Sequence, residues 1–355
     1  MGVPPHRALS KLSKQYGPII HLKLGEVSSI VISSREIAKK VLTVNDLAIA
    51  DRPESIGMET LWYDYKDLAF SPYNEHWKQM RKICIMEILS NKNVRSYGHI
   101  RHDDISKLLE RRDNGELVSE NILDVLLRKQ QSEDLDVPIT DDNIKAIIFD
   151  MFTAGSETSS TTFNWLMTEL MRNPQVTAKA QAEIREAFKG KKTIEESDIQ
   201  KLKYLKLVIK ENLRVHPAVT ILPRACREEC EVDGYTIPYK AKVAVNIWAL
   251  GRDPQYWEEP ETFKPERFEN SSLDFLGNNY EYIPFGAGSR FCPGMNFGLA
   301  NIEVPLAQLL YHFDWKLPHG MNSDDLDMSE MPGVSVQRKN KLYVIATPYN
   351  PPIEG

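Results

Sequence analysis

Cysteine is scarce in this chain, whose 355 residues include four cysteines, at positions 84, 226, 230 and 292. So few cysteines cannot form the disulfide framework of a small secreted domain, and they suit a reducing compartment. Cys226 and Cys230 stand four residues apart, but no second pair and no nearby histidine completes a zinc site. We therefore interpret both as structural residues.

Long apolar runs and an excess of positive charge are missing too. No stretch approaches the roughly 18 uninterrupted apolar residues of a membrane-spanning helix. Residues 1–6 contain neither the apolar core of a signal peptide nor a myristoylation site, so we expect a chain without an anchor, at most peripheral to a membrane. The formal net charge of -6 and the pI near 5.8 argue against nucleic acid as a partner.

The rest of the composition allows a large buried core, since 42% of the residues are hydrophobic and 26% are charged. It favours one large domain or two closely packed lobes. Capping residues and periodicity predict the longest helix from Thr140 to Arg172, where Asn173-Pro174 stops it. Shorter helices are predicted over residues 34–42, 76–89, 203–215 and 295–312.

Strands are predicted near the start of the chain and in its second half. Apolar residues on either side of Gly25-Glu26 predict a β-hairpin within residues 16–33. The segments 218–224 and 232–246 predict further strands, and 334–336 with 342–345 predict a hairpin around a polar turn. The charged segment between them, 95–131, has a predicted turn at Asn114-Gly115. The sequence therefore predicts a mainly helical fold with a small β-rich lobe.

The stretch from Phe285 to Gly294 carries the clearest chemical signal. It places Cys292 on a glycine-rich loop directly before the helix predicted over 295–312. Backbone N–H groups at a helix N-terminus favour a thiolate, so we predict a lowered thiol pKa and a metal ligand. The glycines, among them Gly288, allow tight turns and the close approach of a flat ligand, whose acidic group Arg290 can neutralise.

Simpler interpretations of this loop exist. An isolated cysteine in apolar surroundings is more often a small core residue than a ligand. Gly286-x-Gly288 could be mistaken for a dinucleotide-binding loop, but the third glycine of that motif is absent where Phe291 stands. The full ordered string Phe-x-x-Gly-x-Arg-x-Cys-x-Gly is long enough to favour a ligand site.

Two helical motifs add to this signal. Trp77 and Arg81 are four residues apart on one helix face, where an exposed cation stacked on an indole is the simpler interpretation. The stretch 154–158, Ala-Gly-Ser-Glu-Thr, lies near the middle of the longest helix. Glycine there costs about 1 kcal/mol relative to alanine, so Ala154 and Gly155 predict a groove for a small ligand. A polar, slightly bent patch of buried helix is the alternative.

In this order along the chain, the motifs resemble those of the cytochrome P450 family, and the loops are closest to plant microsomal members that oxidise terpenoids. The resemblance implies a cytochrome P450 fold and one haem-thiolate monooxygenase domain over residues 1–355. It implies that the Cys292 thiolate binds the iron of haem b (heme). The other residues that it implies around the cofactor are Trp77, Arg81, Arg224, Phe285, Gly288, Arg290 and Gly294, with the four side chains Trp77, Arg81, Arg224 and Arg290 holding the propionates.

The same resemblance implies the chemistry. Ala154 and Gly155 would leave room for O2, and Glu157 and Thr158 would deliver protons to it. A lipophilic small molecule would be hydroxylated near Ala154, in a pocket that also takes in Val219 and Ile221 of the apolar segment 218–224 and the stretch from Gly333 to Val336. Without the resemblance, that segment is an ordinary buried strand that ends in a surface cation, Arg224.

Partners and location follow from the resemblance as well. The sequence shows neither a flavin nor a nicotinamide site, so electrons would come from a separate NADPH-cytochrome reductase. The family lies on the cytosolic face of the endoplasmic reticulum membrane. Glu211, Arg214 and Arg267 would form a buried network that stabilises the fold, although an exposed Glu211–Arg214 pair would contribute under about 1 kcal/mol.

The chain departs from the family in length. Members carry helices that roof the substrate pocket where this chain passes directly from Glu110 to Arg111, so we expect an internal deletion near residues 110–111 and a fold lacking part of its roof. The usual anchor is missing as well. Two alternatives to an active enzyme remain: a non-catalytic remnant that binds haem at most, and a soluble helical interaction protein without a cofactor.

Overall fold

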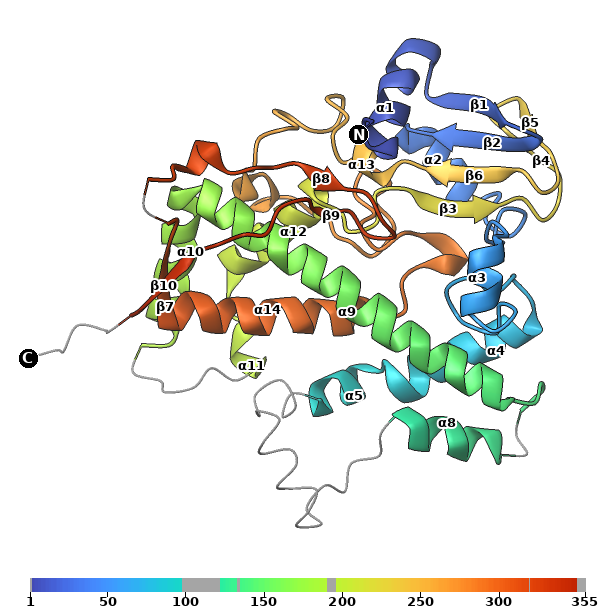
Figure 1. Ribbon diagram of the computed structural model, residues 1–355, viewed down its shortest axis with the longest axis horizontal. Helices are drawn as coiled ribbons and strands as arrows, with labels where there is room; N and C mark the ends of the chain where they lie inside the picture. Colours follow the sequence, from blue (N-terminus) through green and yellow to red (C-terminus); the bar gives the residue numbers. More distant parts are fainter. Residues whose placement is uncertain (1, 98–121, 133–134, 190–195, 319, 350–355) are drawn as a thin grey trace, which may run out of the picture.

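A computed structural model describes residues 2–97, 122–132, 135–189, 196–318 and 320–349. Helices form most of the molecule, and a small sheet lies at one end, at the upper right of Figure 1. The predicted turn at Asn114-Gly115 and the expected deletion near 110–111 lie outside the described residues. Within the part that is described, no helix combines the length and apolar character needed to cross a membrane.

The sheet joins segments from both halves of the chain. Strands β1 (Ile19–Leu24) and β2 (Val27–Ile32) pair antiparallel, which confirms the predicted hairpin. Strand β2 pairs in parallel with β6 (Lys242–Val245), which pairs antiparallel with β3 (Leu222–Ala225). The strand predicted over 218–224 is thus shorter at its start, because residues 218–221 form bends. Strands β4 (Cys230–Val232) and β5 (Tyr235–Ile237) form a separate hairpin.

Short helices flank this sheet and enter the helical part. Helix α1 (Pro5–Tyr16) precedes β1, and α2 (Arg35–Leu42) begins where Ser34 Oγ accepts a hydrogen bond from Ile37 N, as predicted. Apolar side chains of the sheet and of α2 form one buried cluster. The remaining helices of the first part are α3 (Ile56–Leu61), α4 (Glu75–Ile83), the π-helix η1 (Cys84–Ile88), α5 (Asn91–Ser96) and α8 (Ile122–Gln130).

Helix α9 (Asp141–Arg172) crosses the molecule, as Figure 1 shows. The Thr140 cap is confirmed, since its side chain accepts from Asn143 N and the Asn143 side chain accepts from Thr140 N. At about 1.5 Å per residue the helix is about 48 Å long. Its C-terminal half packs with α10 (Pro174–Ala187), α12 (Lys203–Val215) and α14 (Met295–His312) around the largest apolar cluster. Its N-terminal half packs with α4 and α8.

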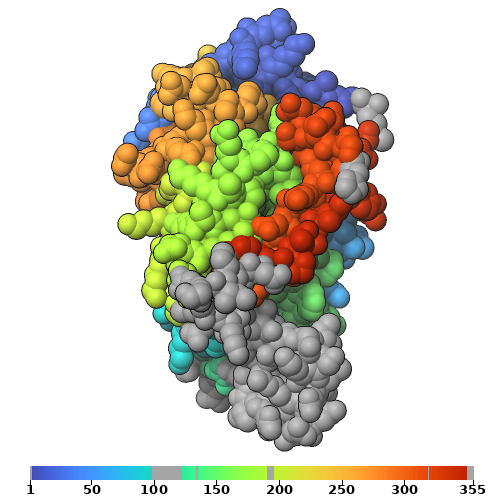
Figure 2. Space-filling model, turned by 90° about the vertical axis from the view of Figure 1, so that its left-hand side faces the viewer, coloured from blue at the N-terminus to red at the C-terminus, as the bar shows by residue number. Residues whose placement is uncertain are grey.

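The predicted hairpin of 334–336 with 342–345 is wrong. Strand β9 (Gln337–Arg338) pairs with β8 (Glu330–Met331), and β10 (Ile345–Pro348) pairs with β7 (Phe313–Lys316). Both segments therefore find their partners earlier in the chain. Figure 2 shows the red C-terminal segment lying beside the green segment that contains the end of α9 and α10. The other short helices are α11 (Glu196–Ile199), α13 (Ile247–Leu250), η2 (Pro265–Phe268), η3 (Gly288–Arg290) and η4 (Ser323–Asp325).

The predicted network of Glu211, Arg214 and Arg267 is confirmed. Arg214 donates from Nε and Nη2 to the two carboxylate oxygens of Glu211, both at 2.8 Å, and Arg267 Nε donates to Glu211 Oε1 at 3.0 Å. Arg214 Nη1 also donates to the Gly251 carbonyl at 2.7 Å. Because Glu211 and Arg214 are fully buried, the network joins α12 to the irregular 250–268 segment without competition from water.

Candidate functional site

The loop that carries Cys292 is closed by its own backbone. Cys292 N donates to the Phe285 carbonyl at 3.0 Å, and the single turn η3 lies between them. Gly286 and Gly288 have φ angles of 76° and 69°, in the left-handed region that favours glycine. A Cβ on Gly288 would also lie 2.8 Å from the Leu42 carbonyl oxygen. The loop thus depends on glycine at these two positions.

Gly294 differs from the other two glycines. Its φ is -92°, and a Cβ there would meet no protein atom within 4 Å. Gly294 therefore leaves open space beside the thiol, where helix α14 begins at Met295. On the other side of the loop, the Phe285 ring packs edge-on against Phe275 with the ring centroids 5.6 Å apart. The predicted loop residues therefore divide into those that shape the backbone and one that leaves room beside Cys292.

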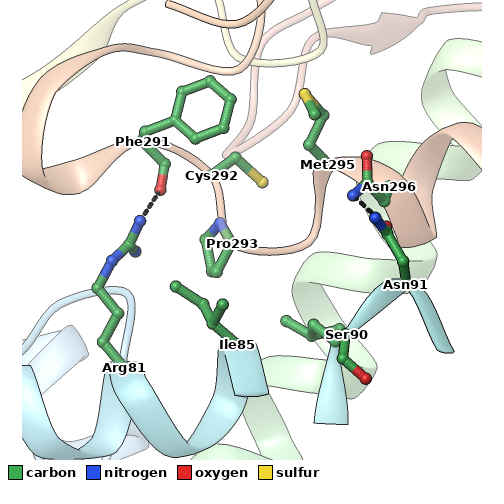
Figure 3. Close-up of a pocket in the computed structure, with 10 residues that line it drawn as sticks. Arg81, Ile85, Ser90, Asn91, Phe291, Cys292, Pro293, Met295 and Asn296 are labelled. Atoms are coloured by element: carbon green, nitrogen blue, oxygen red, sulfur yellow. Dashed lines mark hydrogen bonds between the residues drawn. The ribbon is translucent and has the colours of Figure 1, made fainter. Parts of the chain in front are cut away.

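The Cys292 side chain lines a cavity of about 300 Å³ (Figure 3). Its walls come from α4, η1, α5, the cysteine loop and the start of α14, through the residues Arg81, Ile85, Leu89, Ser90, Asn91, Phe291, Pro293, Met295 and Asn296. Burial raises the pKa of the thiol, although the Gly294 N–H and the Arg81 charge act in the opposite direction. The predicted lowering of this pKa is therefore wrong for the chain alone, because burial outweighs the effect of the helix N-terminus. A metal ion would displace the thiol proton.

Arginine side chains gather above this loop. Arg81 Nη2 donates to the Phe291 carbonyl at 2.5 Å, which ties α4 to the loop (Figure 3). Arg290 donates from Nε to the Ala50 carbonyl at 2.8 Å and from Nη2 to the Ser71 carbonyl at 2.6 Å. Their guanidinium carbons lie 5.4 Å and 4.1 Å from the centre of the Trp77 ring, which packs against both cations.

Trp77 itself is not free to bind a ligand through its indole N–H. Its Nε1 donates to the Leu68 carbonyl at 2.9 Å, and the side chain is buried. The structure therefore brings the predicted Trp77 and Arg81 to the site together, with Trp77 supporting the arginines through its ring. A cation stacked on an indole, the simpler interpretation of this pair, describes the contact that Trp77 makes.

Arg224 completes the group and is fully buried. Its Nη2 donates to the Ala287 carbonyl at 2.9 Å, but Nε and Nη1 find no acceptor among the described residues, and neither does Nη1 of Arg290. Burial, and then the neighbouring arginines, lower the pKa of Arg224 well below its usual value and that of Arg290 to about 9. Buried cations with unpaired N–H groups are costly unless an anion accepts from them.

Arg52 belongs to the same cluster and was missed in the sequence. Burial, with a smaller effect from the charge of Arg81, lowers its pKa to about 10. Its Nε donates to the Ala69 carbonyl at 2.9 Å, and Nη1 donates to the Pro223 carbonyl. The string Asp51-Arg52-Pro53 carries no spacing that links it to the cysteine loop, so only the folded chain brings it there.

The middle of α9 carries the second half of the predicted site. Thr158 Oγ1 donates to the Ala154 carbonyl at 2.6 Å, four residues earlier, within a helix that continues unbroken from Asp141 to Arg172. Gly155 faces Phe297 of α14, and a Cβ there would lie 3.5 Å from the Phe297 ring, an ordinary contact. Gly155 therefore packs against the helix that begins directly after the cysteine loop.

Glu157 is bound to the C-terminal segment. Its Oε1 accepts from Ser335 Oγ at 2.7 Å and from Ser335 N at 3.4 Å. Val336 N in turn donates to the Ala218 carbonyl at 2.8 Å. The stretch 333–336 therefore lies between α9 and the segment that holds Val219 and Ile221, both of which are partly buried.

These residues fit a haem. The buried N–H groups of Arg224 and Arg290 that lack acceptors match carboxylate oxygens such as those of the two propionates. Cys292 supplies a sulfur ligand, and Gly294 leaves space next to it. The chain thus offers a sulfur that would hold the iron and a group of four arginines near the same loop, and α9 packs at Gly155 on the helix that follows that loop.

Comparison with known proteins agrees with this fit. The family model described as Cytochrome P450 matches residues 2–120 and 110–345. Cytochrome P450 71D13 of Mentha piperita is 47% identical over 446 residues, covering 99% of this chain and 89% of the relative. Premnaspirodiene oxygenase of Hyoscyamus muticus is 46% identical over 451 residues, covering 99% and 90%. A zebra fish cytochrome P450 with abiraterone shares the fold, with a TM-score of 0.81 and 24% identity over 98% of this chain and 100% of that chain.

Proposed function

Since this chain belongs to the cytochrome P450 family and is a haem-thiolate monooxygenase, we propose that it hydroxylates a lipophilic small molecule of the terpenoid class. The name of the premnaspirodiene oxygenase describes the oxygenation of such a hydrocarbon, and that relative is 46% identical to the chain. The observation that carries the proposal is the position of Cys292 below a cluster of buried arginines with unpaired N–H groups.

The roles proposed for the cofactor side follow from the contacts. Cys292 would hold the iron through its thiolate, Phe285 and Gly288 shape the loop around it, and Gly294 leaves room beside it. Arg224 and Arg290 donate their unpaired N–H groups to the propionates, with Arg81 and Arg52 beside them and Trp77 stacked underneath. Bound haem supplies the activation of O2 and the insertion of one oxygen atom into a C–H bond.

The roles proposed for residues of α9 are the delivery of protons and the provision of room for a small ligand. The Thr158 hydroxyl, held on the Ala154 carbonyl, is positioned to pass a proton toward the groove at Ala154 and Gly155. Glu157, whose Oε1 accepts from Ser335 Oγ at 2.7 Å, would be the source of that proton. Val219 and Ile221 contribute apolar wall. Electrons come from a separate NADPH-cytochrome reductase, and the site of action is the cytosolic face of the endoplasmic reticulum membrane, both on the strength of the family resemblance.

We also propose that residues 1–355 form one domain with an internal deletion near 110–111. Two observations support it. The family model matches the chain in two pieces that meet at residues 110–120. The alignment with Cytochrome P450 71D13 spans 446 positions although the chain has 355 residues, so at least 91 positions stand opposite gaps in this chain.

A non-catalytic remnant is the second candidate function. Phe152 of α9, three residues before Gly155, is 73% exposed, and Ile56 of α3 is 84% exposed. Exposed apolar side chains of this kind are what a missing roof would leave, and water entering near the middle of α9 would oppose catalysis. This observation concerns turnover only, because the cysteine loop and the arginine cluster stay intact.

One experiment tests both candidates. The full chain is expressed, loaded with haem, reduced under carbon monoxide, and its spectrum recorded; turnover of premnaspirodiene with a plant reductase is then measured. A thiolate-type band with turnover supports the monooxygenase, and the band alone supports the remnant. Cys292→Ala should abolish the thiolate band, and an unchanged spectrum in that variant would remove the assignment of Cys292.

A further inference from the structure

Cys226 and Cys230 lie side by side in the structure, although three residues separate them in the sequence. Strand β4 begins at Cys230, and its register places Cys230 directly opposite Ile237 of β5. The Cys226 sulfur lies 3.6 Å from the Ile237 carbonyl oxygen, so it reaches the residue that faces Cys230. The two thiols also share a hydrogen bond. They thus form a pair in the β4–β5 hairpin, which lies beside the four-stranded sheet in Figure 1.

The backbone fixes Cys226 in this position. Its N–H donates to the Ala241 carbonyl at 2.9 Å, and its carbonyl accepts from Lys240 N at 2.8 Å. Its side chain is 2% exposed and belongs to the apolar cluster of the sheet, whereas Cys230 packs at the edge of that cluster and is partly exposed. A small dissolved molecule therefore meets Cys230 first, with Cys226 directly behind it.

A bond between the two sulfurs would disturb few other contacts. The Cys226 thiol donates to the Glu228 carbonyl at 3.0 Å, and a disulfide would replace this hydrogen bond. Arg227, Glu228 and Glu229, which separate the cysteines, are exposed, and residues 227–228 form a bend. This connecting segment can adjust toward the geometry of a disulfide without moving the buried core.

The raised pKa values of the two thiols slow an oxidation but do not oppose it at equilibrium. Burial raises the pKa of Cys230 to about 12, with a further effect from the neighbouring Cys226. Burial also raises the pKa of Cys226. Because the thiolate is the attacking species, both shifts lower the rate at neutral pH. Stabilisation of the thiolate is what makes a disulfide easy to reduce, so thiols with raised pKa values form the more lasting disulfide.

We propose that Cys226 and Cys230 form a dithiol that a small disulfide such as glutathione disulfide oxidises reversibly to an intramolecular disulfide. The Cys230 thiolate attacks one sulfur of glutathione disulfide and releases one glutathione. Cys226 then attacks Cys230 Sγ in the mixed disulfide, releases the second glutathione and closes the bond between the cysteines. Two electrons pass to glutathione disulfide, and the two thiol protons end on the two glutathione molecules.

The contact between the two cysteines favours the second step of this exchange. The attacking and the attacked sulfur belong to one chain and are held next to each other, so closure is an intramolecular reaction between positioned groups. In the reducing compartment that the few cysteines suit, the dithiol is the resting form, and the disulfide forms when glutathione disulfide accumulates. This inference does not rest on the proposed monooxygenase function.

The proposal is tested on the full chain with added haem, equilibrated at different ratios of glutathione to glutathione disulfide. After free thiols are blocked, trypsin cleaves behind Arg224, Arg227 and Lys240, which places the two cysteines in separate peptides, 225–227 and 228–240. A disulfide between them is then detected by mass spectrometry as one linked pair, which dithiothreitol should separate. The equilibrium constant for its formation should be at least about tenfold larger in the folded chain than in the chain unfolded in urea.

A folded chain that forms no linked pair, or forms it no more readily than the unfolded chain, would overturn the proposal. Failure to bind haem would count against the proposed function alone, because the peptides report on the two cysteines in either case.

Serine variants test the order of the two steps. In Cys226→Ser, Cys230 should retain one glutathione as a mixed disulfide, whereas Cys230→Ser should take up little glutathione because Cys226 is buried. Cys84→Ser is the matched control, since it removes a buried thiol from another part of the molecule, and it should leave the linked pair unchanged. Equal glutathione uptake in the first two variants would refute Cys230 as the first thiol, and loss of the pair in Cys84→Ser would refute the pairing. If a serine variant does not fold, the linked pair in the unaltered chain decides.

Discussion

Gly288 and Gly294 lie six residues apart in one loop, but their surroundings differ. Gly288 has a φ of 69°, and a Cβ there would lie 2.8 Å from the Leu42 carbonyl. Gly294 has a φ of -92°, and a Cβ there would have no atom within 4 Å apart from those of its chain neighbours. Gly288 therefore serves the fold, whereas Gly294 is proposed to leave space for the cofactor.

Alanine substitutions separate these two roles. Gly288→Ala should lower the free energy of unfolding by about 2 kcal/mol or more, because it adds left-handed strain and a backbone clash. Gly294→Ala should change it by less than about 0.5 kcal/mol and should weaken haem uptake. Urea unfolding of the haem-free chain and haem titration measure the two effects. Equal loss of stability in both variants would contradict the assignment.

Single residues also show which parts of the candidate site can be predicted from the sequence and which cannot. The cysteine loop is recognisable because ten ordered positions lie in one stretch, and its contacts with Trp77, Arg81 and Arg224 follow the predicted grouping. Arg52 and Asp150 were missed because each is one polar residue in an unremarkable context. Their roles depend on which segments the fold brings to them, and no local spacing encodes that.

At the scale of helices and strands, the sequence predicts correctly those elements whose ends and turns are set by neighbouring residues. The bounds predicted for helix α9 agree with the structure because Thr140 caps it and Asn173-Pro174 ends it. The hairpin of β1 and β2 is predictable because its turn joins adjacent strands. The predicted C-terminal hairpin is wrong because β10 pairs with β7 and β9 pairs with β8. Strand propensity indicates that a segment is a strand, but it does not determine which other strand pairs with it.

The link between α12 and the 250–268 segment gives a prediction at this scale. Glu211→Gln leaves the buried Arg214 without its charge partner, so the free energy of unfolding should fall by about 3 to 5 kcal/mol. Glu259→Gln is the matched control, because Glu259 pairs with Lys264 at 3.4 Å on the exposed surface, and it should cost under about 1 kcal/mol. Urea unfolding compares them. A similar small loss in both variants would show that the buried network does not stabilise the fold.

At the scale of the whole molecule, two buried acidic sites should set opposite pH limits to stability. Although burial alone would raise it, hydrogen bonds from His6 and Arg7 lower the pKa of Glu330 to about 2. Burial, and then the charge of Asp67, raise the pKa of Asp150 to about 7. Glu330 joins α1 to β8, and Asp150 joins α9 to Trp62 and Leu68, so the two groups report on different parts of the molecule.

The sign of each effect follows from the direction of its shift. Glu330 has a lowered folded-state pKa, so its contribution is present above about pH 4.5 and is lost as the pH falls toward 2. Asp150 has a raised folded-state pKa, so its contribution to the stability of the fold is present below about pH 4 and is lost as the pH rises through 7.

Melting temperatures between pH 2 and 8 should therefore respond differently to two neutral variants. Glu330→Gln should flatten the part of the curve below about pH 4.5, and Asp150→Asn should flatten the part between about pH 4 and 7, because each removes one titrating group. Asp142→Asn, exposed on α9, is the control and should leave the neutral part of the curve as it is. If Asp150→Asn retains the full loss of stability between pH 4 and 7, the buried carboxyl on α9 does not set that limit, and another group must titrate there.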